Sequence, residues 1–426
     1  MTVKQTVNKT EKISIFCIIT LVLGFVAGSV VWTILQVMQI GIDLLWTSLP
    51  GVLGLSGGIT DTLVYSLIVC LIGGLFIGLG QKRYGSLPHT MEEVMAIVKT
   101  DGGYPYNHLP TIALAALMPL IFGGALGPEA GLSGLIAGIC CWIGDTMKYK
   151  ADKVAALAEA GLAATLGVIF GAPLFGIAKY IEPKDALRNR KRLVTKPVRV
   201  VIYCFGVAGG MLAFVVLSKI TGLSAGLPRF DAHHAVGLEQ WKWFLPLIAV
   251  GIVFALYYAG VEKITHILGE KLSSRPVTRA MIAGACVAVA GTFLPLSMFS
   301  GEHQMAPLIE GWQTGSPQIM VLSAVVKLAL VSICINFGWK GGSIFPIIFS
   351  GALLGYTFAL IVGMDGAFAV AVLTAALYAY VMRQPVTVVM VLLLCFPVTY
   401  IIPLAVSALI AGNLPNPFIK NEKNND

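Results

Sequence analysis

A succession of long apolar runs constrains the fold of this chain more than any other feature. A helix that crosses the hydrocarbon core of a bilayer needs about 20 mainly apolar residues. Because 57% of the 426 residues are hydrophobic and only 12% are charged, the chain has too few charges to cover a soluble domain of this size. We therefore predict an all-α polytopic membrane protein. Nine runs approach or exceed the length of a span, and they lie at 13–45, 63–79, 111–143, 200–216, 243–261, 281–299, 319–337, 344–364 and 386–410.

The lengths of these runs vary widely. Several are too long or too short for one straight span, which favours broken, tilted and re-entrant helices. The first run follows a tail that carries Lys4, Lys9 and Lys12. It is too long for the apolar region of a signal peptide and has no clear small-x-small cleavage site, so we predict a retained helix.

Basic residues cluster at 184–199, 148–153 and 271–279. Loops rich in Lys and Arg stay on the cytoplasmic side of a membrane. We therefore expect these loops and both tails, 1–12 and 412–426, to be cytoplasmic, in a multi-pass protein of the inner or plasma membrane. A nucleic-acid partner for the first cluster is the weaker interpretation, and none is predicted.

The chain is predicted to contain two transmembrane halves, 13–216 and 217–411. Each half has a similar short segment, GGALGPEAGLSG at 123–134 and GGSIFPIIFSGALLG at 341–355. Both segments open with a Gly pair and place a Pro near the start of an apolar helix. Related segments in two halves are typical of transporters and channels that are built from repeats.

Glycine followed by proline in an apolar region favours a helix N-terminus inside the membrane. Pro is tolerated in the first helical turn, and Gly allows the sharp turn before it. The N–H groups and the dipole at such an end attract an anion, and a break of this kind in lipid must be buried in protein or line a cavity. The alternative for any single segment is a cap or kink that binds nothing. Three segments have the pattern, with helix-breaking residues Pro88, Gly127, Pro128, Gly342 and Pro346.

Glu129 is the only Asp, Glu, Lys or Arg between Asp101 and Asp145. An ionisable group at membrane depth costs on the order of 3 kcal/mol or more and usually has a function. In the first turn of a helix, the carboxylate suits the same dipole that would attract an anion. We therefore predict that Glu129 competes with an anion and that its protonation releases the site, as a gate does. The alternative is a structural acid at a helix start.

The residues around Glu129 resemble the gating motif of the CLC chloride channel and transporter family. That motif reads G-R/K-E-G-P, and LGPEAG at 126–131 is similar to it, with Pro128 in place of the basic residue. The resemblance implies that Glu129 is the gating glutamate. A rival alignment lays 124–128 on the motif and places Leu126 at the gate position. We prefer the first alignment because it keeps both the acid and the preceding Leu-Gly.

Two further motifs resemble anion-binding segments of the family. The segment G-S-L-P at 85–88 is similar to the family's G-S-G-I-P but is one residue shorter. The resemblance therefore implies that Ser86 or, if the gap falls elsewhere, Gly85 takes the anion-binding position. The segment G-S-I-F-P is similar to G-x-F-x-P. The resemblance implies that the backbone amides of Ser343 and Ile344 bind the anion, with Phe345 one position later than the family's Phe.

Other segments support the resemblance, and some depart from it. FGAPLFGIAKYIE at 170–182 and RQPVTVVMVLLL at 383–394 are similar to family helices. Counting along the first of these puts Glu182 on the closing acid and Pro183 on the inner glutamate of proton-coupled members. The family's tyrosine near the C-terminus is matched best by Phe418, which cannot donate a hydrogen bond. The resemblance therefore implies an inner gate or proton position that is altered or absent.

The resemblance implies a CLC-like, inverted-repeat bundle of tilted and broken helices. It also implies a homodimer in the lipid bilayer with a pore in each subunit, selective for chloride or a similar small monovalent anion. The chain resembles a short prokaryotic-type member without C-terminal CBS domains. We expect a channel or a loosely proton-coupled antiporter, not an enzyme. The eight cysteines have no metal-ligand spacing with His, so no metal or cofactor is expected.

Two other functions remain possible from the sequence. The same helix-end chemistry would serve a secondary transporter of another anionic solute. An intramembrane serine protease is a remote alternative, because Ser56 and Ser224 fit G-x-S-x-G and His233 lies near the second serine. Lys327 and Arg383 lie in apolar surroundings. We expect Arg383 to end or start a helix at the membrane interface. Lys327 either faces the pore or packs away from it, and the second alternative is preferred.

Overall fold

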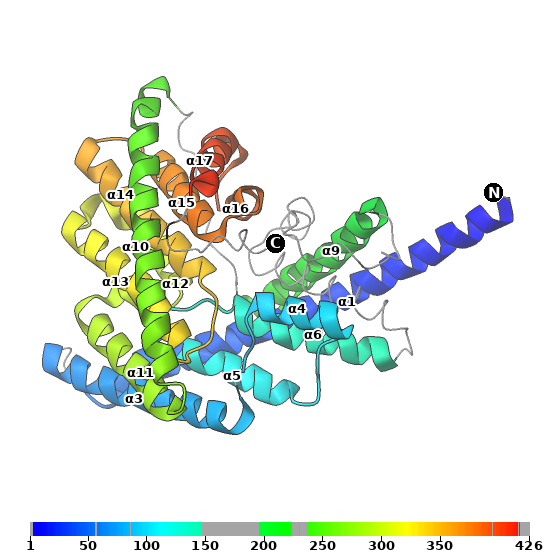
Figure 1. Cartoon of the computed structure of the whole chain (residues 1–426), viewed down its shortest axis with the longest axis horizontal. Coiled ribbons are helices and arrows are strands. Elements are labelled where there is room, and N and C mark those ends of the chain that lie inside the picture. Colours follow the sequence, from blue (N-terminus) through cyan, green and yellow to red (C-terminus); the bar gives the residue numbers. More distant parts are fainter. Residues whose placement is uncertain are drawn as a thin grey trace. The chain divides into compact units, whose positions relative to one another are not determined.

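The structure is a computed structural model that describes residues 3–55, 58–85, 87–146, 196–223, 230, 237–393, 395–415 and 417. In these ranges the regular elements are helices (Figure 1). Their bounds are α1 Val3–Asp43, α2 Leu49–Val52, α3 Ile59–Tyr84, α4 Met91–Asp101, α5 Leu109–Ile121, α6 Glu129–Thr146, α9 Lys196–Thr221, α10 Phe244–Lys271, α11 Pro276–Phe293, α12 Glu302–Gly311, α13 Pro317–Asn336, α14 Ile344–Val362, α15 Gly366–Met382, α16 Pro385–Leu392 and α17 Ile401–Asn413.

The prediction of an all-α polytopic membrane protein is confirmed. Within the described ranges, seven helical stretches are long and apolar enough to cross a membrane. Further apolar helices, such as α5 and α15, are shorter. The seven stretches are Cys17–Val52, Ile59–Tyr84, Tyr203–Thr221, Glu239–Lys271, Pro276–Phe293, Pro317–Asn336 and Ile344–Val362.

The chain forms two compact units that interleave along the sequence. The first unit comprises Met1–Ile40, Pro88–Leu117 and Pro128–Gly226. The second comprises Gly41–Leu87, Met118–Gly127 and Leu227–Asp426. These units are defined by contacts and not by a repeat in the sequence. The two transmembrane halves at 13–216 and 217–411 therefore remain a prediction.

In the first unit, glycines let helices α1 and α9 approach backbone to backbone. A Cβ built on Gly24 would lie 1.9 Å from the carbonyl oxygen of Gly206, and one on Gly28 would lie 2.6 Å from that of Gly210. Helices in lipid associate through such small residues, because no hydrophobic effect drives them together. Larger side chains at these positions would force α1 and α9 apart.

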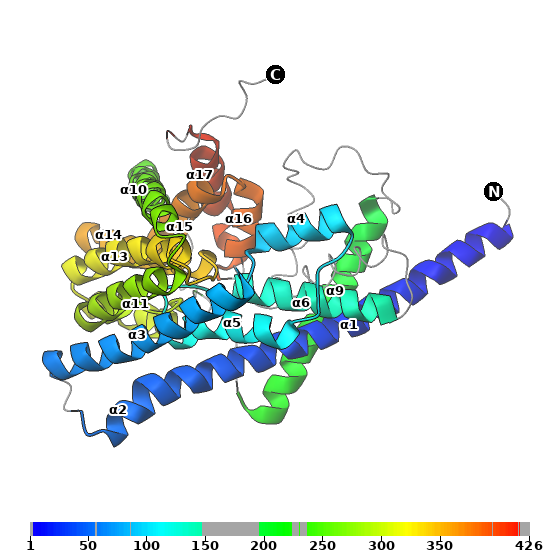
Figure 2. The ribbon, with the colours of Figure 1, turned by 60° about the horizontal axis from the view of Figure 1, so that its bottom comes forward.

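In the second unit, helix α14 lies against α13 and α15, and α10 also contacts both of these helices (Figure 1). Nearly all of α14 is buried, which makes it the core of the unit. Gly355 makes this packing possible, because a Cβ there would lie 2.5 Å from the Cα of Val370 on α15. A second close pair, α3 and α11, also belongs to this unit (Figure 2).

The apolar run at 111–143 is not one helix. Helix α5 ends at Ile121, where the N–H of Gly124 donates to the carbonyl of Pro119 at 2.8 Å, and α6 begins at Glu129. Gly123 has a φ of 90°, which a residue with a side chain rarely adopts. The prediction of broken helices is confirmed here, because this glycine turn interrupts the backbone ladder.

Asp365 caps the N-terminus of α15, since its carboxylate accepts a hydrogen bond from the N–H of Phe368 at 2.7 Å. We expect Asp365→Ala to destabilise the protein by about 1 kcal/mol, because one N–H of the first turn loses its acceptor. Asp365→Asn keeps a cap and should cost less. Thermal unfolding in detergent measures both variants, and an equal loss for the two would contradict the capping role.

Candidate functional site

The N-terminus of α14 is the first part of the candidate site. The helix begins at Ile344, directly after Ser343, whose side chain makes no capping hydrogen bond. Pro346 is the third residue of the helix, as expected for the first turn. Ile344 and Phe345 are buried, at 5% and 2% exposure. The N–H groups of the first turn of α14 therefore lie at a buried helix end.

The segment before Glu129 is tied to the segment before α14 by backbone pairing within the second unit. Gly127 and Gly342 exchange two hydrogen bonds, each of 2.8 Å from the N–H of one to the carbonyl of the other. Next to them, a Cβ on Gly341 would lie 2.7 Å from the Cβ of Leu126, so the close approach requires glycine. The structure thus joins the two Gly-rich motifs that the sequence singled out.

Glu129 is described with the first unit, to which it belongs. It is the first residue of α6 and is only 2% exposed. The helix turn is closed by the N–H of Leu132, which donates to the carbonyl of Pro128 at 3.1 Å. The carboxylate therefore belongs to the first turn, as the sequence predicts, where the helix dipole favours a negative charge. Its role as a gate remains a prediction.

Glycines bury the first half of α6 against its neighbours in the first unit. A Cβ on Gly131 would lie 2.2 Å from that of Ala116 on α5, and one on Gly134 would lie 3.0 Å from the hydroxyl of Tyr104. That hydroxyl is 2.8 Å from Nδ1 of His89, and burial raises the pKa of Tyr104 to about 12. Tyr104 therefore stays protonated, and its hydroxyl holds His89 beside α6.

The segment at 84–94 differs from the prediction. Gly85, with a φ of 79°, ends α3, and Pro88 precedes the next helix instead of lying in its first turn. Helix α4 begins only at Met91, because Thr90 and Glu93 form a capping box. The N–H groups of Thr90 and Glu93 thus have acceptors from the chain itself. A break exists at Pro88, and anion binding by Gly85 stays a prediction.

Tyr258 is a residue of this region that could not be assigned from the sequence. It is a buried residue of α10, and its hydroxyl lies close to the side chains of Ser332 and Ser343. A tyrosine inside an apolar helix is usually a packing residue, so nothing in the sequence signals this position. Tyr258 places a hydroxyl next to the residue that precedes α14.

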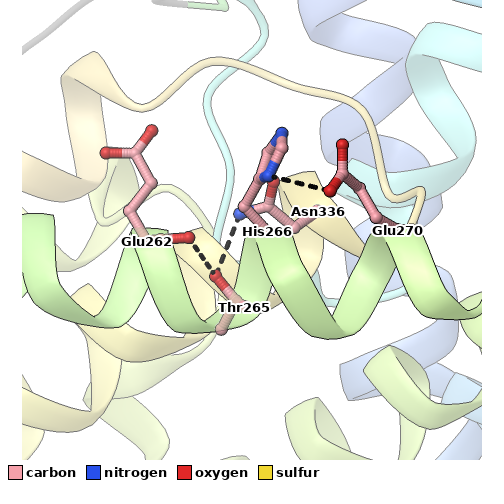
Figure 3. Close-up of polar contacts among 5 residues, drawn as sticks. All are labelled: Glu262, Thr265, His266, Glu270 and Asn336. Carbon is pink, nitrogen blue, oxygen red and sulfur yellow. Dashed lines mark hydrogen bonds and ion pairs between the residues drawn. The ribbon is translucent and has the colours of Figure 1, made fainter. Parts of the chain in front are cut away.

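A polar contact between α10 and α13 holds the chain just before the turn into α14 (Figure 3). The amide of Asn336, at the end of α13, donates to Oγ1 of Thr265 at 2.9 Å and to the carbonyl of Ser332 at 3.0 Å. On the same helix as Thr265, His266 faces Glu270 at 3.8 Å. His266 and Glu270 both lie on α10, so the Asn336 contact is the part that joins the two helices.

A second contact holds the turn itself. The side-chain amide of Gln81, on α3, donates to the carbonyl of Gly338, and Arg279 donates to the Gln81 oxygen at 3.1 Å. Gly338 has a φ of 99°, so the turn needs a glycine there. Together with Asn336, this contact positions the chain that enters α14 from both sides.

Several candidate residues lie outside the described residues. They are Ser56, Ser86, Glu182, Ser224, His233 and Phe418. Arg383 is described and ends α15, with its guanidinium donating to the carbonyls of Gly412 and Leu414. Its place at a helix end agrees with the prediction, because the fixed fork of its donors suits the open carbonyls beyond the helix.

The voltage-gated chloride channel family provides the decisive comparison, because its model matches residues 68–415. The chain belongs to this family, the CLC family. The ion-transport protein YfeO of Escherichia coli (strain SMS-3-5 / SECEC) is 25% identical over 345 residues, which cover 78% of this chain and 76% of the relative. YfeO of Shigella flexneri is similar to the same extent.

Solved structures of CLC proteins share the fold. A slow cyanobacterial Cl⁻/H⁺ antiporter superposes with a TM-score of 0.76 at 18% identity and covers 93% of each chain. A CLC-type fluoride/proton antiporter gives 0.73 at 17% identity, covering 95% of this chain and 96% of its own. The expected CLC fold of an integral membrane protein is therefore confirmed.

Proposed function

We propose that this CLC protein moves small monovalent anions, such as chloride, through a pore in each subunit of a homodimer. The anion would bind at the buried N-terminus of α14, near the amides of Ser343 and Ile344. A helix N-terminus stabilises a negative charge by the direction of its N–H groups and by its dipole. The two CLC neighbours, a Cl⁻/H⁺ antiporter and a fluoride/proton antiporter, support a halide as the substrate.

We propose further that Glu129 gates this pathway. One observation carries this proposal: the pairing of Gly127 with Gly342. Glu129 follows Gly127 by two residues, which limits the Cα–Cα distance between them to about 7.6 Å. The segment that carries the carboxylate is thus anchored at the residue that precedes Ser343. A charged Glu129 competes with the anion for the same donors, and protonation removes the competitor.

The mode of transport proposed is that of a channel or a loosely proton-coupled antiporter, in the cell membrane with both termini cytoplasmic. In the family resemblance, Pro183 stands at the inner glutamate and Phe418 at the tyrosine, and neither side chain can carry a proton. Proton movement coupled tightly to anions needs a relay on the inner side as well as at Glu129. The sequence thus favours weak coupling over strict exchange.

Reversal potentials of the full chain in liposomes test the proposed function. Under a chloride gradient with no pH gradient, we expect a potential near the chloride equilibrium potential and little movement of protons. Uphill proton movement in a fixed ratio to chloride would exclude the channel. Uptake of an organic acid without chloride flux would favour the alternative, a transporter of another anionic solute. The mass of the protein in detergent tests the dimer.

A further inference from the structure

Lys327 is a fully buried lysine in the middle of α13, a helix long and apolar enough to cross the membrane. Its Nζ donates to the carbonyls of Leu296 at 3.0 Å, Met298 at 2.8 Å and Phe299 at 2.9 Å. In the part of the chain that the structure describes, the ammonium makes no ion pair. All three of its N–H groups therefore serve one backbone loop, which is the full capacity of a charged lysine.

The position of the ammonium is fixed by helix α14 as well as by the loop. Nζ lies 4.9 Å from the centre of the Phe349 ring, on the second turn of that helix. A cation attracted to the face of an aromatic ring gains more stabilisation when water is excluded. Lys327 thus connects α13, the core helix α14 and the loop that follows the 3₁₀ turn Pro295–Ser297.

The loop needs this support, because its backbone is strained. Phe299 has a φ of 58°, in the left-handed region that costs a residue with a side chain about 1–2 kcal/mol. The ammonium of Lys327 donates a hydrogen bond to the carbonyl of Phe299 at 2.9 Å. The ring of Phe299 packs edge-on against Trp46, with ring centres 5.6 Å apart. Lys327 and Trp46 therefore hold this residue from its carbonyl and from its ring.

The same loop holds the glycine turn between α5 and α6. The N–H of Phe299 donates to the carbonyl of Gly123 at 3.2 Å. A Cβ on Gly123 would lie 2.4 Å from Cε of Met298 and 3.0 Å from the Trp46 ring. Trp46 in turn donates from Nε1 to the carbonyl of Ile121 at 2.9 Å. The turn is therefore enclosed between the Lys327-held loop and Trp46.

Four residues after Gly123, the chain reaches Gly127 and its pairing with Gly342. The segment 121–127 is thus held at its start by Trp46, in its middle by the loop, and at its end by the start of the α14 motif. The middle contact depends on a loop whose three carbonyls share Lys327 as their donor. We propose that Lys327 is a positioning residue that fixes the segment leading into Glu129.

This inference rests on the proposed function, because it assigns Lys327 an effect on the Glu129 gate. Loss of the ammonium would release the loop at 296–299 and let the segment before Glu129 shift. In the proposed gate the charged carboxylate occupies the donors of the anion site, and a carboxylate that is held less firmly there is protonated more easily. The pH dependence of anion flux would then change, although Lys327 itself touches no transported ion.

The test measures anion flux against pH for Lys327→Met in liposomes, alone and combined with Glu129→Gln. We expect Lys327→Met to move the pH of half-maximal flux upward by about one unit, which corresponds to a tenfold change in a protonation constant. Lys327→Arg, which keeps the charge and the donors, should restore most of the wild-type profile. In the Glu129→Gln background, Lys327→Met should change the profile no further.

Three results would overturn the inference. A folded Lys327→Met protein with the wild-type pH profile would leave Lys327 a structural residue only. An effect of the same size in the Glu129→Gln background would assign Lys327 a direct electrostatic action on the anion. If Lys327→Met does not fold, Lys327→Gln is measured in its place, because a glutamine amide has only two N–H groups for the three carbonyls. We expect a smaller upward shift in this variant, and an unchanged profile would contradict the inference. Failure of Glu129→Gln alone would instead reject the proposed gate.

Discussion

Anion flux through the Glu129→Gln protein is expected to lose its dependence on pH. In the wild-type protein, flux should rise on acidification, because protonation removes the carboxylate that competes with the anion. Above the pKa of a gating carboxyl group, its protonated fraction changes about tenfold per pH unit. Glutamine has the shape of the protonated acid and does not titrate in this range, so flux should stay near the acid value at every pH. Chloride efflux from liposomes between pH 4.5 and 8 measures this.

Glu302 offers a matched control for this experiment. It is also an acid in the first turn of a helix, α12, and it is 7% exposed. Glu302→Gln should keep the pH dependence of the wild-type protein, since Glu302 does not follow the Gly127–Gly342 pairing. An equal loss of pH dependence in both variants would show a general effect of buried acids. A wild-type profile in Glu129→Gln would reject the gate.

The second large effect is expected for Gly78→Ala on α3. A Cβ at this position would lie 2.4 Å from the Cα of Val277 on α11, which is backbone and cannot rotate away. Forcing an extra carbon into a packed contact typically costs about 1–3 kcal/mol, because the two helices must separate. We expect Gly78→Ala to reach at least the upper part of this range, as a loss of thermal stability in detergent.

Gly80 is the control on the same helix, two residues further along. A Cβ built on it meets no atom within 4 Å. Alanine is favoured over glycine in a helix interior by about 1 kcal/mol, so Gly80→Ala should be neutral or slightly stabilising. Equal stability of the two variants would contradict the close contact between α3 and α11.

Local properties of the sequence explain which parts of the fold could be predicted. The apolar runs predicted helices and their breaks, because the hydrophobic periodicity and the glycine positions are local properties. The start of α6 at Glu129 also followed from local rules, since Pro128 precedes it. Helix α4 starts later than predicted, because its own capping box at Thr90 outweighs the helix-start preference of Pro88.

The remaining parts of the site depend on contacts between residues far apart in sequence. Tyr258 reaches Ser343 from another helix, and Gln81 reaches Gly338 across more than 250 residues. Lys327 stands out in the sequence as a charge in an apolar run, but its three carbonyl partners lie in a loop outside its own helix α13. A single sequence records the residue types and not these pairings, so such roles required the structure.

The pairing of Gly127 with Gly342 uses only backbone atoms, so it does not depend on the functional group of any side chain. The pairing requires small residues, because the two segments must approach closely. The contact of Gly341 with Leu126 illustrates this limit. Many sequences satisfy a size limit, whereas few satisfy a demand for a particular functional group. A chain can therefore change the residues of the predicted anion-binding motifs and still place its helix ends in the same way. For such proteins, a comparison of glycine positions would reveal more about the transport pathway than a comparison of polar residues.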